Sequence, residues 1–349
     1  MMKASPDVSR ITFYLAHRLD GGLILAALLP LLIIQSLLQP GLPTLADLPI
    51  HLYRTLEYGQ SWSQGVIVPR WAPNLAYGYG YPLYVFAPPL PYWLGLSFTA
   101  LGFSLETAFK LLIILTILLY AIGMYLLGRD LWGRVEAGLV AATAYAFAPF
   151  ALREALLYGG NVPQYLAIGL FPWTLWAILR ATRTRSWGWG VAAACFYAAI
   201  LLSHLFHALI FTPVVGLFGL ILWGSGVRGQ KSGAGGQRLK DKLENLSFTI
   251  HNLQFTIPSL LPLIAIPLGL LLAAFFWLPA FTERVFTRAQ ADIYLEKSPF
   301  YVRYPNWPEL IAWIAPLDAR AANPYVPLTL GLITFTLAAV GFLAGIISW

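Results

Sequence analysis

Runs of about twenty apolar residues recur along the whole chain, and they restrict its fold more than any other feature. A helix of roughly 20 apolar residues crosses a hydrocarbon layer of about 30 Å, and lipid offers no partner for unpaired backbone groups. Hydrophobic residues make up 58% of the chain and charged residues only 11%, against about 25% charged residues in an ordinary soluble domain. The sequence therefore predicts an all-α, polytopic transmembrane helix bundle.

About eight spans are predicted, and a ninth apolar run needs a decision. The spans are approximately 21–39, 108–127, 135–151, 163–180, 187–203, 207–224, 257–280 and 327–348. The run 83–103 is long enough to cross, but its prolines lie in its first half, where they would remove helix hydrogen bonds. If it crossed, the basic turns near Arg129 and Arg180 would lie opposite the basic N-terminus, against the positive-inside rule. We therefore expect 83–103 to be interfacial or re-entrant.

This arrangement predicts a multi-pass protein of the cell membrane with a cytoplasmic N-terminus. Residues 1–349 form a single membrane domain, with a first outer loop at 40–107 that contains interfacial helices. A Gly-, Ser- and Lys-rich stretch predicts a flexible cytoplasmic loop at 225–256. The last span reaches Trp349 without a polar flank, so we expect the chain to be truncated there. The net charge of +7 reflects cytoplasmic loops, so no nucleic-acid partner is expected.

Ionisable residues from four different segments fall at or near the outer ends of the predicted spans. Such groups are costly near membrane depth unless they face protein or a water-filled cavity. We therefore expect a convergent polar cavity at the outer face. The residues are Asp47, His51, Arg54, Arg153, Glu154, His204, His207, Glu283 and Arg284.

The clearest pattern lies in the first outer loop. At about 100° per residue, Asp47, His51, Arg54 and Tyr58 fall on one polar face of an amphipathic helix. Two interpretations stay open. Asp47 stands two residues before Pro49, where it would be a good N-cap, and the other side chains would then be the wet side of an interfacial helix. Alternatively, the stripe faces a functional cavity.

An aromatic and proline-rich stretch follows, from Pro69 through Tyr81 to Trp93. This composition favours a rigid, non-helical surface at the level of the lipid headgroups, where Tyr and Trp prefer to lie. The stretch would either contribute to substrate binding, through Tyr81, or form a plain aromatic belt.

Several motifs together, in order, resemble one family. It is the prokaryotic membrane protein family named "6-pyruvoyl-tetrahydropterin synthase-related", whose architecture is similar to that of GT-C glycosyltransferases. The motifs are Asp47-x-x-x-His51-x-x-Arg54, Trp71…Gly78-Tyr-Gly-Tyr-Pro82, Pro88-Pro-Leu-Pro-Tyr92, Gly160-Asn-x-Pro-Gln164, Leu202-Ser-His204 and Leu278-Pro-Ala-x-x-Glu283.

The resemblance implies a GT-C-like glycosyltransferase that takes a sugar from a polyprenyl-phosphate donor and transfers it to an acceptor at the outer membrane face. Asp47 stands where that superfamily places its catalytic acid, and Glu154 follows the third span, where a second acidic residue often occurs. The chain departs from the family at Gln164, a position that is often Glu.

The chemistry of such a site can be stated from the residue types. A carboxylate held out of bulk water can accept the proton of an acceptor hydroxyl, which is the role predicted for Asp47. Arg54 and His204 would face the departing phosphate. The other predicted substrate-binding residues are His51, Tyr81, Glu283 and Arg284. His204 and His207 could also ligate a divalent cation, or could be structural histidines.

Two other function classes compete with the enzyme. A transporter or flippase of lipid-linked glycans would usually show repeated halves and binding groups near the bilayer midplane. The chain shows no such repeat, and its ionisable groups gather at one face, which favours the enzyme. A catalytically inactive membrane scaffold with the same fold is the third class.

Overall fold

The structure, a computed structural model, describes residues 20–42, 47–152, 160–224 and 257–286, together with a few isolated positions between 308 and 343. Within these ranges the chain folds as helices joined by turns. The backbone pairing of strand type in this part of the chain is one isolated antiparallel bridge between Ala72 and Tyr81. The predicted all-α class is therefore confirmed for the described residues.

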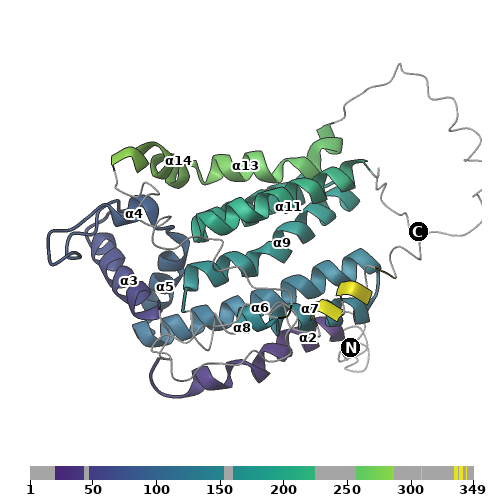
Figure 1. Cartoon of the computed structure of the whole chain (residues 1–349), viewed down its shortest axis with the longest axis horizontal. Coiled ribbons are helices and arrows are strands. Elements are labelled where there is room, and N and C mark those ends of the chain that lie inside the picture. The colour runs from purple at the N-terminus through teal and green to yellow at the C-terminus, as the bar shows by residue number, and fades with distance from the viewer. Residues whose placement is uncertain are drawn as a thin grey trace, which may run out of the picture.

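The long helices run side by side, and three shorter ones gather at one end of the molecule (Figure 1). That end contains α3, α4 and α5, while α13 and α14 lie on the opposite side of the bundle from α2 (Figure 1). In chain order the elements are α2 (Gly21–Leu28), η1 (Leu29–Leu32), η2 (Ile34–Leu38), α3 (Leu48–Ser63), α4 (Leu83–Phe86), α5 (Leu90–Ala100), α6 (Leu105–Trp132), α7 (Val135–Ala146), α8 (Pro149–Leu152), α9 (Val162–Thr184), α10 (Trp187–Ser203), α11 (Leu205–Gly224), η4 (Ile257–Leu263), α13 (Ala265–Leu272), α14 (Ala274–Thr282) and η5 (Glu283–Phe286).

The central helix α6 has clear start and stop signals. The Oγ of Ser104 accepts a hydrogen bond from the backbone N–H of Thr107 at 3.2 Å, which satisfies one of the free donors of the first turn. Gly133 ends the helix in the left-handed conformation, with φ of 68°, and its N–H donates to the carbonyl of Arg129. The 28 residues between these signals extend about 42 Å, more than the thickness of the hydrocarbon layer.

His204 separates α10 from α11. Its backbone is extended, with φ of −159° and ψ of 106°, so the helix cannot continue through it. Gly190 near the start of α10 and Gly219 near the end of α11 both lie against residues 261–264. The chain therefore reverses at His204, which places this side chain at the same end of the bundle as the start of α9.

Three helices of the described part are long and apolar enough to cross a membrane: α6, α9 and α11. The pair α13 and α14, bent by 77° at Ala273, adds a fourth if it forms one span. Shorter apolar helices occupy three other predicted spans, at Gly21–Leu32, Val135–Ala146 and Trp187–Ser203. The predicted span 327–348 lies almost entirely outside the described residues.

The run 83–103 forms α4 and α5, not one long helix. Pro89 and Pro91 stand at the N-cap and in the first turn of α5, where proline is tolerated because the first N–H groups have no helical partner. With 11 residues, α5 extends only about 16 Å, too short to cross a bilayer. The prolines therefore divide this apolar run before it can become a span.

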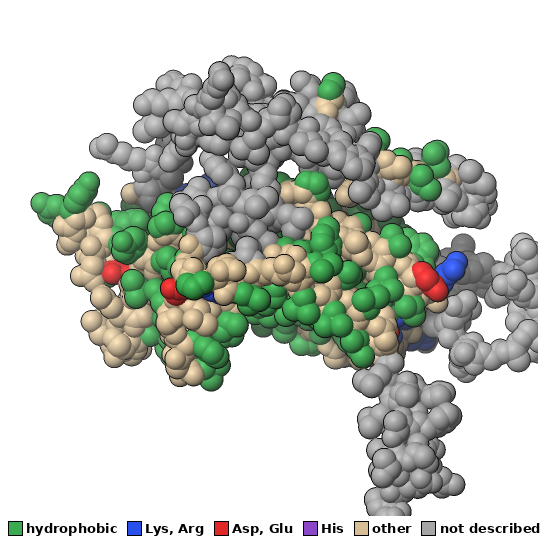
Figure 2. Space-filling view, turned by 90° about the horizontal axis from the view of Figure 1, so that it is seen from below, with side chains coloured by type: hydrophobic (Ala, Val, Ile, Leu, Met, Phe, Trp, Pro, Cys, Tyr) green, Lys and Arg blue, Asp and Glu red, His purple; other side chains and the backbone are tan. Residues whose placement is uncertain are grey.

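The outer surface of the bundle is apolar. Leu209 on α11 is 69% exposed, and the outward faces of α2 and α11 carry further exposed leucine, isoleucine and phenylalanine side chains. Figure 2 shows one face covered largely by hydrophobic side chains, with the few visible charged ones toward its two ends. Contact with lipid tails is the physical reason for such a surface in a membrane protein.

Small residues let α7 pack closely against α6. A Cβ atom added at Gly138 would lie 2.8 Å from the backbone oxygen of Tyr125, and one added at Gly128 would lie 2.9 Å from the Cβ of Ala141. Close backbone approach of this kind is a major source of helix association in membranes, where lipid provides no hydrophobic driving force.

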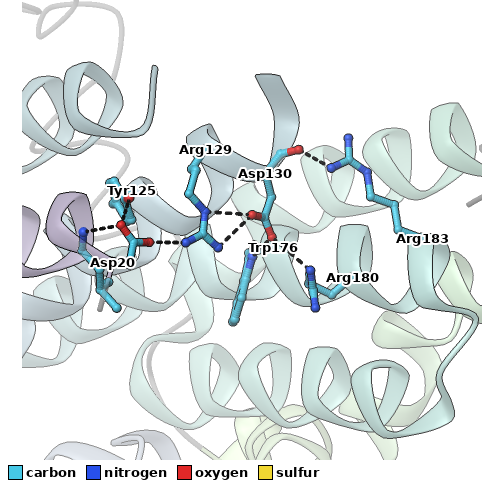
Figure 3. A network of polar contacts seen from close by, with 8 residues as sticks. Asp20, Tyr125, Arg129, Asp130, Trp176, Arg180 and Arg183 are labelled. Carbon is cyan, nitrogen blue, oxygen red and sulfur yellow. Dashed lines mark hydrogen bonds and ion pairs between the residues drawn. The ribbon is translucent and has the colours of Figure 1, made fainter. Parts of the chain in front are cut away.

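A polar network joins α2, α6 and α9 at the end of the bundle away from α3 (Figure 3). Asp20 accepts hydrogen bonds from the Tyr125 hydroxyl at 2.6 Å and from the backbone N–H of Leu23 at 3.1 Å, and it forms an ion pair with Arg129. The start of α2 is thereby tied to the last turns of α6.

Asp130 continues the network toward α9 (Figure 3). Its carboxylate accepts from the Nη2 of Arg129 at 2.9 Å and from the indole N–H of Trp176 at 2.8 Å, and lies 3.6 Å from the Nη1 of Arg180. Arg183 donates to its backbone carbonyl. Two carboxylates thus partly neutralise the arginines at this end.

We expect Gly138→Ala to destabilise the bundle, because the new methyl group would press on backbone of α6 that has no room to move. Overpacking of this kind costs about 1–3 kcal/mol. Thermal unfolding in detergent should show a lower midpoint than in the wild type. The control is Gly216→Ala on α11, where the added Cβ would lie 3.7 Å from Ile266. An equal midpoint for the two variants would contradict the close packing of α6 and α7.

Candidate functional site

The first outer loop contributes α3, whose inner face carries the polar stripe predicted from the sequence. His51, Thr55 and Tyr58 are buried and follow one another at helical spacing. Asp47 occupies the N-cap position, but its side chain makes no capping hydrogen bond. The capping interpretation of Asp47 therefore finds no support in the geometry.

Tyrosines fasten α3 to α4 and α5. The ring of Tyr58 stacks on Tyr92 with centroids 5.6 Å apart, and its edge contacts Tyr84. The Tyr84 hydroxyl donates to the carbonyl of Arg54 at 2.6 Å, and the indole N–H of Trp93 donates to the Tyr58 hydroxyl at 2.9 Å. Burial raises the pKa of the Tyr58 and Tyr84 hydroxyls, so both stay protonated and keep these bonds.

A cavity of about 260 Å³ lies where α3 meets the bundle. Its walls come from α3, from the segment that contains α4 and α5, from the start of α9 and from the break between α10 and α11. The lining residues are His51, Arg54, Leu83, Phe86, Ala87, Pro88, Tyr92, Asn161, Pro163 and His204. The structure thus brings together three predicted site residues from segments 150 positions apart in the chain: His51, Arg54 and His204.

The cavity combines one cation with two neutral imidazoles. Burial lowers the pKa of His51 from 6.5 to about 3, and the charge of Arg54 lowers it further in the same direction. Burial also lowers the pKa of His204. Arg54 forms no ion pair with any carboxylate of the described residues. The lining therefore offers a positive charge that a ligand can neutralise.

His51 also leaves a buried nitrogen without a partner. Its side chain is 5% exposed, and its Nδ1 makes no hydrogen bond within the described part of the chain. An unsatisfied buried polar atom costs about 1–3 kcal/mol. Such atoms in native structures mark a functional site or a place for a bound group.

Asn161 connects the cavity to Asp47. Its Oδ1 accepts from the backbone N–H of Gln164 at 3.2 Å, which caps α9 and fixes the orientation of the amide. Its Nδ2 then donates to the Oδ2 of Asp47 at 3.4 Å. Asp47 is thereby placed next to the cavity, although it is not among the lining residues.

A second set of contacts runs from α9 to His204. The Nε2 of Gln164 lies 3.3 Å from the Nε2 of His207, and the Nδ1 atoms of His207 and His204 lie 3.2 Å apart. The backbone N–H of His207 also donates to the Nδ1 of His204 at 3.4 Å. The first turn of α9 therefore contacts both Asp47 and the histidine pair.

The other predicted site residues lie away from the cavity lining. Tyr81 pairs its backbone with Ala72 in the isolated bridge. Glu283, at the end of α14, forms an ion pair with Arg70 of the first outer loop, and the guanidinium of Arg284 lies 4.3 Å from the ring centroid of Phe281. Glu154 lies outside the described residues.

Sequence reasoning assigned no role to Asn161 and gave none to Gln164. The signal for Asn161 was present, since an asparagine directly before Val162-Pro163 is typical of a helix N-cap. The contact from Asn161 to Asp47 could not be read from the chain, because the two residues lie 114 positions apart.

A metal site is not defined by these contacts. In the ranges that the structure describes, no three His, Cys, Asp or Glu side chains converge in a way that could hold a metal ion. The Nδ1 atoms of His204 and His207 face each other at hydrogen-bond distance.

We expect the burial of His51 to make the folded protein less stable in acid. The unfolded chain binds a proton on this imidazole below pH 6.5, whereas the folded protein binds it only near pH 3. Unfolding therefore takes up a proton between these values, and stability falls as the pH falls, by at most about 1.4 kcal/mol per pH unit. Thermal midpoints measured from pH 7 to pH 4 should drop less in His51→Asn than in the wild type. Equal drops would contradict the buried, neutral state of His51.

Comparison with known proteins supports the resemblance seen in the motifs. No curated protein matches the chain. The model of a family described as "6-pyruvoyl-tetrahydropterin synthase related domain", a membrane protein, matches residues 84–231. The match contains Tyr92, Asn161 and His204 of the cavity, while α3 with His51 and Arg54 precedes it. Over residues 84–231, the chain is thus a 6-pyruvoyl-tetrahydropterin synthase related domain of a membrane protein, the family that the ordered motifs predicted.

Proposed function

We propose that the protein is a GT-C-like membrane glycosyltransferase that transfers a sugar from a polyprenyl-phosphate donor to an acceptor hydroxyl. One observation carries the proposal: a single cavity is lined by Arg54, His51 and His204, and a carboxylate, Asp47, is held beside it through Asn161. The cavity thus combines a charge suited to a phosphate with a base suited to a hydroxyl.

The proposed reaction is a displacement at the anomeric carbon of the donor sugar. The acceptor oxygen forms a bond to this carbon while the bond from the carbon to the phosphate oxygen breaks. Asp47 accepts the proton of the acceptor hydroxyl. The polyprenyl phosphate leaves with its electron pair, and the Arg54 guanidinium stabilises the charge that develops on it.

The size and walls of the cavity fit the polar end of such a donor. Its volume of about 260 Å³ is below the 300–1,000 Å³ of most drug-sized ligand sites, which suits one sugar phosphate better than an oligosaccharide. Leu83, Phe86 and Pro88 supply an apolar wall on which the first isoprene units would pack.

The proposal places the cavity at the outer face of the cell membrane, with the N-terminus in the cytoplasm and eight spans in all. The arginines of the Asp20–Asp130 network, together with Arg134 and Arg185, lie at or near the end of the bundle away from the cavity. Positive side chains concentrate on the cytoplasmic side of membrane proteins, which supports this orientation.

Cysteine labelling in intact cells tests the orientation. In a Cys195→Ser background, an impermeant thiol reagent should label Ser63→Cys at the end of α3 but not Thr184→Cys at the end of α9. Both positions are exposed, so accessibility of the side chain is matched. Labelling of Thr184→Cys from outside would reverse the orientation and move the cavity to the cytoplasmic face.

Transfer should depend on the carboxylate of Asp47. The Asp47→Asn variant cannot accept a proton at neutral pH, and general-base catalysis is typically worth about 10²–10⁴-fold in rate. Membranes incubated with radiolabelled polyprenyl-phosphate sugars should therefore show at least a hundredfold loss of transfer at matched expression. The control Glu136→Gln makes the same chemical change at a position whose side chain is 74% exposed.

The structural cost of Asp47→Asn should be small, because the carboxylate makes no capping hydrogen bond in α3. A variant that keeps more than about a tenth of wild-type transfer would exclude Asp47 as the base. Wild-type membranes that transfer none of the sugars offered would count against the glycosyltransferase and favour a transporter or an inactive scaffold.

A further inference from the structure

The first turn of α9 holds the two sides of the candidate site at once. Asn161 and Gln164 stand three residues apart, so their side chains leave the same side of the helix. The amide of Asn161 donates to Asp47, and the amide of Gln164 contacts His207. The second contact has a consequence for the protons on His204.

The histidine pair has one consistent arrangement of protons. A backbone N–H can only donate, so the Nδ1 of His204, 3.4 Å from the N–H of His207, must carry its lone pair. The Nδ1 of His207, 3.2 Å away, must then carry a proton and donate to the same atom. A neutral ring holds one proton, so the Nε2 of His207 is an acceptor.

Gln164 completes the arrangement. Its Nε2 amide donates to the Nε2 of His207 at 3.3 Å, in agreement with an acceptor at that atom. His204 is left with its proton on Nε2, and this atom has no hydrogen-bond partner within the described ranges. Because His204 lines the cavity, its remaining donor is available to a ligand there.

We infer that Gln164 is a positioning residue: through His207 it fixes His204 in the Nε2-protonated form, as a hydrogen-bond donor at the cavity. Together with Arg54, this gives the cavity two donors and suits an anionic oxygen such as that of a phosphate ester. The inference assigns Gln164 and His207 a part in the proposed transfer reaction and in that respect rests on the proposed function. The proton arrangement can be tested separately from transfer.

Nitrogen NMR of the wild-type protein tests the arrangement directly. The chain has five histidines, so protein labelled with ¹⁵N-histidine in nanodiscs can be assigned with single His→Gln variants. At pH 7, His204 should be protonated on Nε2 and His207 on Nδ1. The opposite form of either ring would overturn the inference without any variant.

The nearly isosteric variant Gln164→Glu provides the second test. A carboxylate has only acceptors, so the Nε2 of His207 must then carry a proton, and its ¹⁵N signal should move to the protonated range. The control Gln64→Glu makes the same change at the exposed C-cap of α3 and should leave both rings unchanged. An unchanged His207 spectrum in Gln164→Glu would overturn the inference.

The transfer assay separates this inference from the proposed function. If the protein transfers sugar, Gln164→Glu should raise the KM for the donor about fivefold or more, the size of effect expected from one lost hydrogen bond. An unchanged KM would overturn the positioning role. If no transfer is found although both rings have the expected protons, the proposed function fails while the arrangement at His204 stands.

Discussion

The absence of hydrogen-bond partners in lipid is the constraint on which the rest of this structure depends. It requires the apolar runs to be helical, so turns, prolines and charged side chains gather at the two ends of the bundle. Helix α6 illustrates the division, because its first turns contact the short helix α5 and its last turns carry Arg129 and Asp130. Any polar chemistry in the described helices has to take place at one of these ends.

The two ends manage their charges differently. At one end, Asp20 and Asp130 pair with arginines from α6 and α9, and tyrosine and tryptophan donors satisfy the same carboxylates. At the other end, Arg54 lacks an ion pair within the described residues, and His51 keeps a buried nitrogen without a partner. The first end is satisfied by the protein itself, whereas the second is arranged to be completed by another molecule.

The helix α9 links these ends through its own capping chemistry. Asn161 caps its N-terminus and holds Asp47, while Arg180 and Arg183 near its C-terminus contact Asp130. A single well-bounded helix thus orients both the candidate site and the opposite network. The position of Asp47 relative to the cavity therefore depends on the packing of α9 in the bundle as well as on α3.

Periodicity and composition were sufficient to determine much of this protein: the all-α membrane class, the failure of 83–103 to form one long helix, and the polar face of α3 that carries His51. These features depend on residues close together in the chain, whose spacing decides which side of a helix they share.

The tertiary structure alone decided which polar residues meet. It brought His204 to Arg54 and Asn161 to Asp47, and it placed Tyr81, Glu283 and Arg284 away from the cavity lining. The physical reason is that residues more than a hundred positions apart are brought together by the packing of whole helices. That packing is set by close-contact positions such as Gly138 and by the reversal at His204.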